Sequence, residues 1–501
     1  MNWKIVWRSL GHHDMRKRIF AVLGILVVFR ILAEVPVPIS DPQTLRQVLN
    51  NLFNSGNTPQ LLGFVNVLSG GALANFSILI AGLGPYINAS IIMQMLTKAI
   101  PQLEAMHKEG EYGQKRINQY TRLLTLPLAI AQSIGSIFLI RQAAETIGGT
   151  GNITANTSPM QWVVMIAALT GGSMLLMWLG ELVTEQGLGN GISLLITIGI
   201  VSRLPETISQ ISGTFLGLHD RFNIFGHVIP LDKKSLIVGG LFIVAIVILT
   251  WLVVKLNEAA RRVTINYAKR VQGNRAYGGV TTILPIKLVT AGVIPIIFAV
   301  AFLSVPSFAG QLLTNSHSLF LSHVGTDLSA WFQPPSATTF QTNGLEAYIY
   351  PVVYFSLVFL FTFFYTSVAF NSTEIAENLQ KQGGFIEGVR SGSHTQKYLS
   401  KLVNRLTLFG AISLGTLALI PIIAQIFIGT NLAIGGTSIL ILVSVSLQTL
   451  RAVESRALMV TYDQYSESDF FVDTEPGDIG SPKRRRFSLI PFRRSKSNSA
   501  S

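Results

Sequence analysis

The sequence predicts an all-α polytopic membrane protein with ten transmembrane helices. Hydrophobic residues make up 49% of the 501 residues and charged residues only 13%, a balance typical of chains that cross a membrane many times. Ten apolar segments of about the length of a membrane span are separated by polar connections. The second of these segments follows a shorter apolar piece and is broken by glycine and proline, which predicts a cavity inside the membrane domain.

This apolar stretch, residues 64–97, is too long for one bilayer crossing. It is interrupted by SGG at 69–71 and by GLGP at 82–85. A helix that spans about 30 Å of hydrocarbon needs about 20 residues, so the piece at 64–75 cannot cross alone. Irregular backbone at membrane depth is tolerated only where protein buries it or where it lines a cavity. We therefore expect a cavity; the alternative is a surface helix followed by an ordinary span with a proline near its start.

The ten predicted spans divide into two groups of five. An odd number of spans per group gives the groups opposite orientations, so the pattern predicts two pseudo-symmetric inverted halves around a central site. We expect a cytoplasmic N-terminal segment at 1–18, an N-terminal half at 19–211, a C-terminal half at 212–456 and a disordered cytoplasmic tail at 457–501. The spans are expected at 19–35, 76–97, 123–140, 161–180, 190–208, 235–254, 287–304, 348–370, 405–428 and 435–450.

Positive charge predicts the orientation of these spans. Alternate connections carry 22 Lys and Arg residues on one side and six on the other, and cytoplasmic loops retain positive charge. We therefore place both termini in the cytoplasm. Two connections on this side, 255–287 and 371–405, are long as well as basic, which suits a large acidic or polyanionic partner. The alternative is that their charges only retain the loops and contact lipid headgroups.

Composition argues against several classes of function. The chain has no cysteine, which excludes disulfides and thiol chemistry, and its eight histidines fall in predicted loops or tails. It contains neither an HExxH nor a Walker motif. Inside the spans the clear ionisable pair is Arg30 with Glu34, four residues apart. A secondary transporter with a midplane substrate site, or an intramembrane hydrolase, would need more buried ionisable residues, so both remain alternatives of lower rank.

Two interrupted spans instead carry pairs of bulky aliphatic residues. Leu83 and Ile87 lie four residues apart in the second span, and Ile192 and Ile196 do so in the fifth. Residues at this spacing share one helix face. If the two faces meet, they form a hydrophobic constriction that excludes water and ions by dewetting. Ordinary helix packing is the alternative.

Long strings of residues from about 15 to 460 resemble the SecY family, the channel subunit of bacterial protein translocases. The matching strings are LSGGAL, GPYINASIIMQMLT, KEGEYGQKRINQYTR, MWLGE, TEQGLGNGIS, NYAKR, LPIK, AGVIP, FFYT, ENLQKQGGFIEGVR, RLTL and GGTSILI. The resemblance implies a central pore between the two halves. It also implies a protein-conducting channel that passes unfolded secretory polypeptides across the membrane and releases transmembrane segments sideways into lipid.

The resemblance also implies roles for individual residues. It implies a lateral gate between the second to third and the seventh to eighth spans, with Asn88 and Gln94 as its polar residues. It implies a plug half-helix at Phe64, Leu68, Ser69, Gly70 and Gly71. It implies a pore ring at Leu83, Ile87, Ile192, Ile196, Ile297 and Ile441.

Partners follow from the same resemblance. It implies SecE-like and SecG-like small membrane subunits, signal sequences and nascent polypeptide, and a driving partner that is either the SecA motor ATPase or a ribosome. The bacterial cytoplasmic (inner) membrane is the implied location, anionic lipids are expected around it, and no cofactor or catalytic residue is implied. Two positions depart from the family pattern, Val289 in the gate and Asn274 in a basic loop. The docking residues are implied at Arg261, Arg262, Lys269, Arg270, Arg275 and Arg390.

Overall fold

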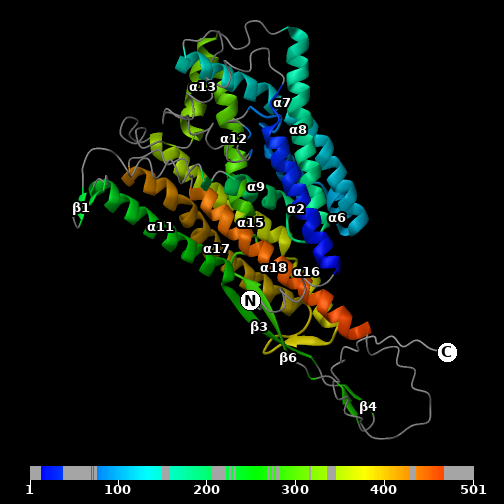
Figure 1. Cartoon of the computed structure of the whole chain (residues 1–501). Helices are drawn as coiled ribbons and strands as arrows, with labels where there is room; N and C mark the ends of the chain where they lie inside the picture. Colours follow the sequence, from blue (N-terminus) through cyan, green and yellow to red (C-terminus); the bar gives the residue numbers. More distant parts are fainter. Residues whose placement is uncertain are drawn as a thin grey trace, which may run out of the picture.

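The structure is a computed structural model of the whole chain, and it is mainly helical (Figure 1). Each of the ten predicted spans overlaps a helix: α2 (His13–Glu34), α5 (Gly84–Ala99), α7 (Glu111–Gly148), α8 (Pro159–Glu185), α9 (Gly191–Ser202), α11 (Lys233–Glu258), α12 (Ile294–Thr314), α15 (Ile349–Ala369), α17 (Ser393–Ile428) and α18 (Gly436–Glu467). The residues described are 13–37, 69, 72, 76–148, 158–202, 204–205, 222–224, 227–229, 233–267, 270–272, 275–277, 279, 281–314, 318–333, 335, 346–428 and 436–467.

Six of the described helices are long and apolar enough to cross a bilayer: α7, α8, α12, α15, α17 and α18. The start of α8 follows from local chemistry. Ser158 caps α8 by accepting from the backbone N–H of Gln161, whose side chain accepts in return from the Ser158 N–H, and Pro159 occupies the first helical position. This multi-spanning architecture confirms the fold class that the sequence predicts.

Several element boundaries differ from the sequence-based expectation. α5 begins only at Gly84, because residues 77–83 form turns instead of helix. α12 begins at Ile294 rather than near 287, because a strand and a turn occupy the preceding residues. α18 continues to Glu467, past the expected start of the tail at 457. The connection expected at 305–347 contains the end of α12 and a further helix, α13 (Leu319–Phe332), which packs against α12.

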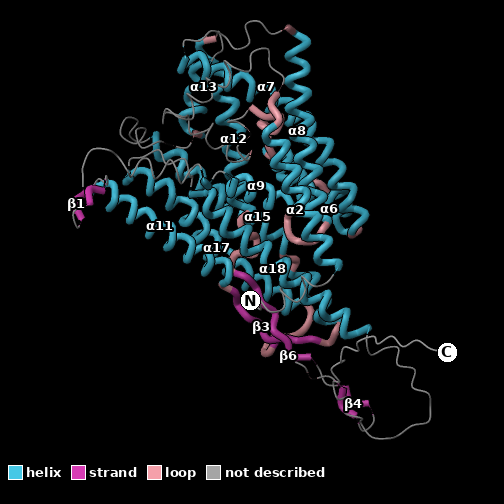
Figure 2. Tube along the Cα trace, viewed as in Figure 1, coloured by secondary structure: helices cyan, strands magenta, loops and turns pink. Residues whose placement is uncertain are grey.

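The two basic connections form one β-sheet, which the sequence analysis did not foresee (Figure 2). Strand β3 (Ala260–Tyr267) pairs antiparallel with β6 (Thr281–Lys287) on one side and with β7 (Gly384–Ile386) on the other. Alternate residues of β3, Val263 and Ile265, are buried against α16 (Ser372–Lys381) and the start of α17. The sheet therefore ties the two connections together by pairing strands β3 and β7, which are more than 100 residues apart in the sequence. Two further pairs of short strands are present: β1 (Phe222–Ile224) with β2 (His227–Ile229), and β4 (Arg270–Gln272) with β5 (Arg275–Tyr277). The remaining described elements are the short helix α6 (Pro101–Lys108) and the 3-10 turn η1 (Glu346–Tyr348).

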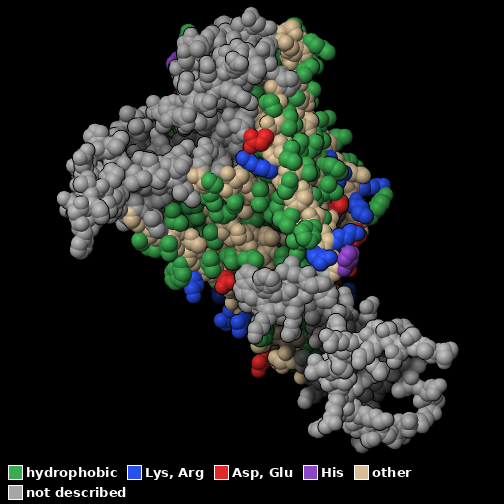
Figure 3. Space-filling model, viewed as in Figure 1, with side chains coloured by type: hydrophobic (Ala, Val, Ile, Leu, Met, Phe, Trp, Pro, Cys, Tyr) green, Lys and Arg blue, Asp and Glu red, His purple; other side chains and the backbone are tan. Residues whose placement is uncertain are grey.

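A large apolar core joins the helices. It draws buried side chains from α2, α5, α8, α9, α11, α12, α15, α17 and α18. Large hydrophobic side chains such as Trp251 and Val352 are also exposed on the outer helix faces, at 59% and 62% of their surface. Figure 3 shows hydrophobic side chains over much of the described surface, with the visible Lys and Arg scattered through its middle and lower parts. An apolar exterior around a packed interior is what a bilayer requires.

Candidate pore constriction and its surroundings

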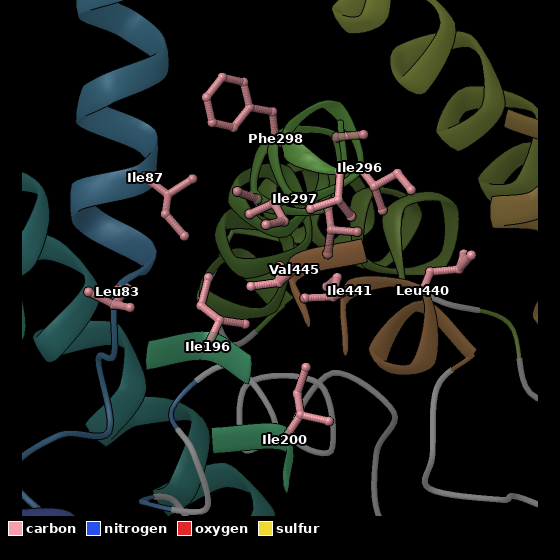
Figure 4. Close-up of a cluster of buried hydrophobic side chains, with 14 of the residues drawn as sticks. Leu83, Ile87, Ile196, Ile200, Ile296, Ile297, Phe298, Leu440, Ile441 and Val445 are labelled. Atoms are coloured by element: carbon pink, nitrogen blue, oxygen red, sulfur yellow. The ribbon is translucent and has the colours of Figure 1, made fainter. Parts of the chain in front are cut away.

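Five of the six predicted ring residues are buried in one cluster. Leu83, Ile87, Ile196, Ile297 and Ile441 all have less than 7% of their surface exposed. They come from the start of α5 and from α9, α12 and α18, so segments from both halves of the sequence contribute. Figure 4 shows Ile87, Ile196, Ile297 and Ile441 pointing toward a common centre.

Ile192, the sixth predicted residue, is only partly buried and packs against this cluster. A cavity of about 90 Å³ adjoins the cluster at this point. Its walls combine four of the aliphatic residues with polar side chains from α5 and α9. The lining residues are Tyr86, Ile87, Ser90, Gln94, Asn190, Ile192, Ser193, Ile196, Ile294, Ile297, Phe298 and Tyr365. Aliphatic and polar side chains thus share the walls of this small space.

Asn190 holds the fifth span in place at this cavity. Its Oδ1 accepts from the backbone N–H groups of Ile192 and Ser193, at 3.1 and 3.2 Å. Such an acceptor satisfies donors that the first helical turn leaves free. The sequence analysis assigned no role to Asn190. An asparagine directly before an apolar helix was the available signal.

The turn at residues 77–83 is irregular backbone that protein buries, although the sequence-based expectation placed these residues in the second span. Its Ile78 N–H donates to the Val35 carbonyl at 3.0 Å, beyond the end of α2. Its Gly82 carbonyl accepts from the Ser173 hydroxyl of α8 at 3.0 Å. Gly82 itself has φ of 58°, in the left-handed region that favours glycine. These hydrogen bonds satisfy backbone N–H and C=O groups that helical bonds would satisfy if the turn were a helix. Inside a membrane such groups need partners within the protein.

The predicted plug falls largely outside the described residues. Phe64, Leu68, Gly70 and Gly71 belong to that part. Ser69 is described and is buried, with 1% of its surface exposed. Nearby, the carbonyl of buried Ala72 accepts from the Ser77 N–H at 2.8 Å.

The predicted gate residues lie on α5. Asn88 and Gln94 are both partly buried, and the Gln94 amide donates to the Ser90 hydroxyl at 3.1 Å. Gln94 also faces the cavity. Val289 is not early in the seventh span: it lies in the turn before α12 and is buried in the apolar core. A hydrocarbon side chain there fits this apolar environment.

The helices on the two sides of the predicted gate pack unequally. α12 packs more extensively against α15 than against α5 or α7. Phe298 of α12 meets Phe361 and Tyr365 of α15 edge-on, with ring centroids 6.2 and 6.4 Å apart. Across the thinner seam, the Phe308 ring of α12 lies over Gly135 of α7, where a Cβ atom would stand only 1.8 Å from the ring. The sequence analysis named neither of these aromatic contacts.

The predicted docking residues are spread along the sheet region. Arg261 and Arg262 are exposed on β3, and Arg390 is exposed in the turn after β7. The Arg390 carbonyl accepts from the Thr395 hydroxyl at 2.8 Å, which fixes this turn against the start of α17. Arg270 and Arg275 lie on β4 and β5, while Lys269 and Asn274 fall outside the described residues.

The multi-spanning fold, together with relatives that are subunits of protein translocases, makes this chain a channel subunit of a protein translocase and not an enzyme. The chain belongs to the SecY family, whose family model matches residues 77–450. This membership also disfavours the transporter and hydrolase alternatives.

Relatives and solved structures agree with this assignment. The protein translocase subunit SecY of Streptomyces galbus is 39% identical, with 91% of this chain and 98% of that protein covered. The subunit of Corynebacterium glutamicum is 38% identical, with 90% and 97% covered. A solved protein-conducting channel superposes with a TM-score of 0.55 at 20% identity, covering 86% of this chain and 91% of that one. A SecY structure concerned with the plug domain gives 0.54 at 21% identity, covering 85% and 90%.

Proposed function

We propose that the aliphatic cluster is the pore ring through which unfolded secretory polypeptides cross the membrane. The observation that carries this proposal is the convergence of Ile87, Ile196, Ile297 and Ile441 from four separate elements (Figure 4). Branched aliphatic side chains exclude water and ions without fixed charge. They also deform around a passing chain, because no buried ion pair or hydrogen-bond network has to be broken.

The gate is proposed to lie between α5 and α7 on one side and α12 and α15 on the other. Aromatic packing makes α12 and α15 a unit, whereas α12 meets α5 and α7 over a thinner seam. Opening of this seam would release a transmembrane segment sideways into lipid. Asn88 and Gln94 are proposed as its polar residues, and the segment containing Phe64, Leu68, Ser69, Gly70 and Gly71 as the plug.

The channel is proposed to be passive, with its driving force supplied from the cytosol. The residues proposed to dock the SecA motor ATPase or a ribosome are Arg261, Arg262 and Arg390, together with Lys269, Arg270 and Arg275, which follow β3 in the sequence. SecE-like and SecG-like subunits are the proposed membrane partners. The excess of positive charge on one side supports cytoplasmic termini in a bacterial inner membrane. Partner or signal-sequence binding then shifts the population from closed to open states.

Site-specific crosslinking tests the proposed path. A photoreactive residue at Ile192, beside the ring, is compared with one at Val247, which is 61% exposed on the outer face of α11. With a secretory chain arrested during export, we expect a crosslink from position 192 and none from position 247. Equal crosslinking from both positions would contradict the proposal that the polypeptide passes through the ring. So would the absence of a crosslink from position 192 while the unarrested chain is exported normally.

A further inference from the structure

Three cations form a stripe along one face of α17. Lys397, Lys401 and Arg405 follow one another at intervals of four residues and are all exposed. Residues at this spacing lie on the same side of a helix. They line an open groove of about 670 Å³ between α17 and α15. These cations are separate from the docking residues proposed on the sheet.

The groove is positive but is not neutralised by protein. Its other lining residues are Phe363, Gln396, Ser400, Asn404 and Leu408, so no carboxylate takes part within the described portion of the chain. Some cations elsewhere in the described part of the chain have a carboxylate of the protein as a direct partner. The Arg122 guanidinium, for example, lies 2.6 Å from a carboxylate oxygen of Glu181. The groove therefore offers a site for an anion from outside the chain.

Apolar side chains adjoin the cations. Phe363 and Leu408 line the groove, and the centroid of the Phe363 ring lies 5.1 Å from that of Phe359 on α15. Leu408 and its neighbour Phe409, about one turn past Arg405, expose 42% and 65% of their surface. After Arg405 the sequence of α17 stays free of charge to its end at Ile428. The cations thus stand where the helix passes from its polar start into its apolar membrane span.

The spacing of the three cations along α17 can be compared with the thickness of the lipid headgroup layer. The rise of about 1.5 Å per residue places Lys397 about 12 Å from Arg405 along the helix. The polar region of one leaflet is about 5–8 Å thick, and long basic side chains bend toward it. Lys401 and Arg405 can therefore both reach one phosphate in the bilayer interface. Lys397, two turns before Arg405, reaches it from the side of the helix start.

We propose that this groove binds an anionic phospholipid. Lys401 and Arg405 hold the phosphate, with Arg405 offering two donors to its oxygens. Ser400 and Asn404 are placed to bond to the polar part of the headgroup, and an acyl chain lies along Phe363 and Leu408. A soluble acidic peptide would leave the apolar half of the groove uncovered, so a lipid fits the whole surface better.

Lipid retention by the purified full chain, with its co-purifying subunits, tests the proposal. The probes are phosphatidylglycerol and phosphatidylcholine with identical acyl chains, counted as bound molecules by native mass spectrometry. The groove variant is Lys397→Gln with Lys401→Gln and Arg405→Gln. The matched control removes three exposed cations elsewhere through Arg261→Gln, Arg262→Gln and Lys381→Gln. Lys401→Gln alone serves as a milder second variant.

We expect the groove variant to lose phosphatidylglycerol at least about tenfold relative to wild type, and Lys401→Gln about fivefold, from the contribution of one basic residue at an anionic surface. The control stays within about twofold, and phosphatidylcholine is unaffected throughout. An equal loss in the control would reduce the effect to net charge and overturn the proposal. So would displacement of the lipid by inorganic phosphate, which indicates a site for a free ion, or unchanged lipid retention with loss of a subunit, which indicates a protein occupant.

Discussion

Gly172 allows the irregular turn to lie against α8. A Cβ atom at this position would stand 2.1 Å from the carbonyl oxygen of Ile78, whereas one at Gly171 would meet nothing within 4 Å. The neighbouring hydroxyl of Ser173 bonds to the same turn. These two adjacent glycines therefore form a matched pair with opposite steric surroundings.

We expect Gly172→Ala to destabilise the protein, because the added methyl collides with backbone that cannot move independently. Overpacking of this kind costs about 1–3 kcal/mol. Gly171→Ala should be neutral or slightly stabilising, because alanine favours helix. Thermal unfolding in detergent measures the difference. Equal unfolding temperatures for the two variants would mean that the turn does not depend on close contact with α8.

Sequence reasoning found ring residues where they occur in pairs. Leu83 with Ile87, and Ile192 with Ile196, repeat every four residues beside helix breakers, so their shared face could be read directly. Ile297 and Ile441 stand alone among other aliphatic residues and carry no such pattern, so only the resemblance could single them out. The contact of Phe308 with Gly135 was predicted neither from residue spacing nor from the resemblance. A contact between helices that are distant in the sequence leaves no local pattern.

At the level of elements, the basic sheet joins two loops into one surface. Arg390 lies in the turn after β7, and β7 pairs with β3, the strand that carries Arg261 and Arg262. We expect Arg390→Glu to reduce partner-driven translocation at least about tenfold, because like charges across an interface are strongly unfavourable. Translocation into membrane vesicles with the purified motor measures this.

Lys115→Glu is the control for this change, since Lys115 is an exposed cation on α7, outside the sheet. It makes the same change of charge and should leave transport near the wild-type rate. Both variants should show wild-type unfolding temperatures, because both side chains are exposed. Normal transport by the Arg390→Glu variant would contradict the docking role.

Element types in the membrane were predictable, and those outside it were less so. Long apolar segments leave little choice but helix, which is why each predicted span overlaps one. Strand β3 has eight residues, but only Val263 and Ile265 mark its buried face. Two buried positions among cations and polar residues are too weak an alternation to predict a strand. The start of α12 was placed too early because β6 and the following turn are themselves apolar.

On the scale of the whole molecule, the two halves of the sequence meet at the aliphatic cluster. Leu83, Ile87 and Ile196 come from the N-terminal half of the sequence, and Ile297 and Ile441 from the C-terminal half. A separation of the halves would therefore open two places at once: the aliphatic cluster, and the thin seam between α12 and its neighbours α5 and α7. One movement would then serve both export across the membrane and release into it.

The resting ion conductance of the reconstituted channel tests this account most directly. The double variant Ile87→Gly with Ile192→Gly is compared with Ile92→Gly with Val201→Gly, which introduces the same residues on the same two helices at positions 40% and 39% exposed. We predict a clear resting leak in the first variant and none in the second. A membrane that stays as tight with the first variant as with the wild-type protein would contradict the aliphatic seal.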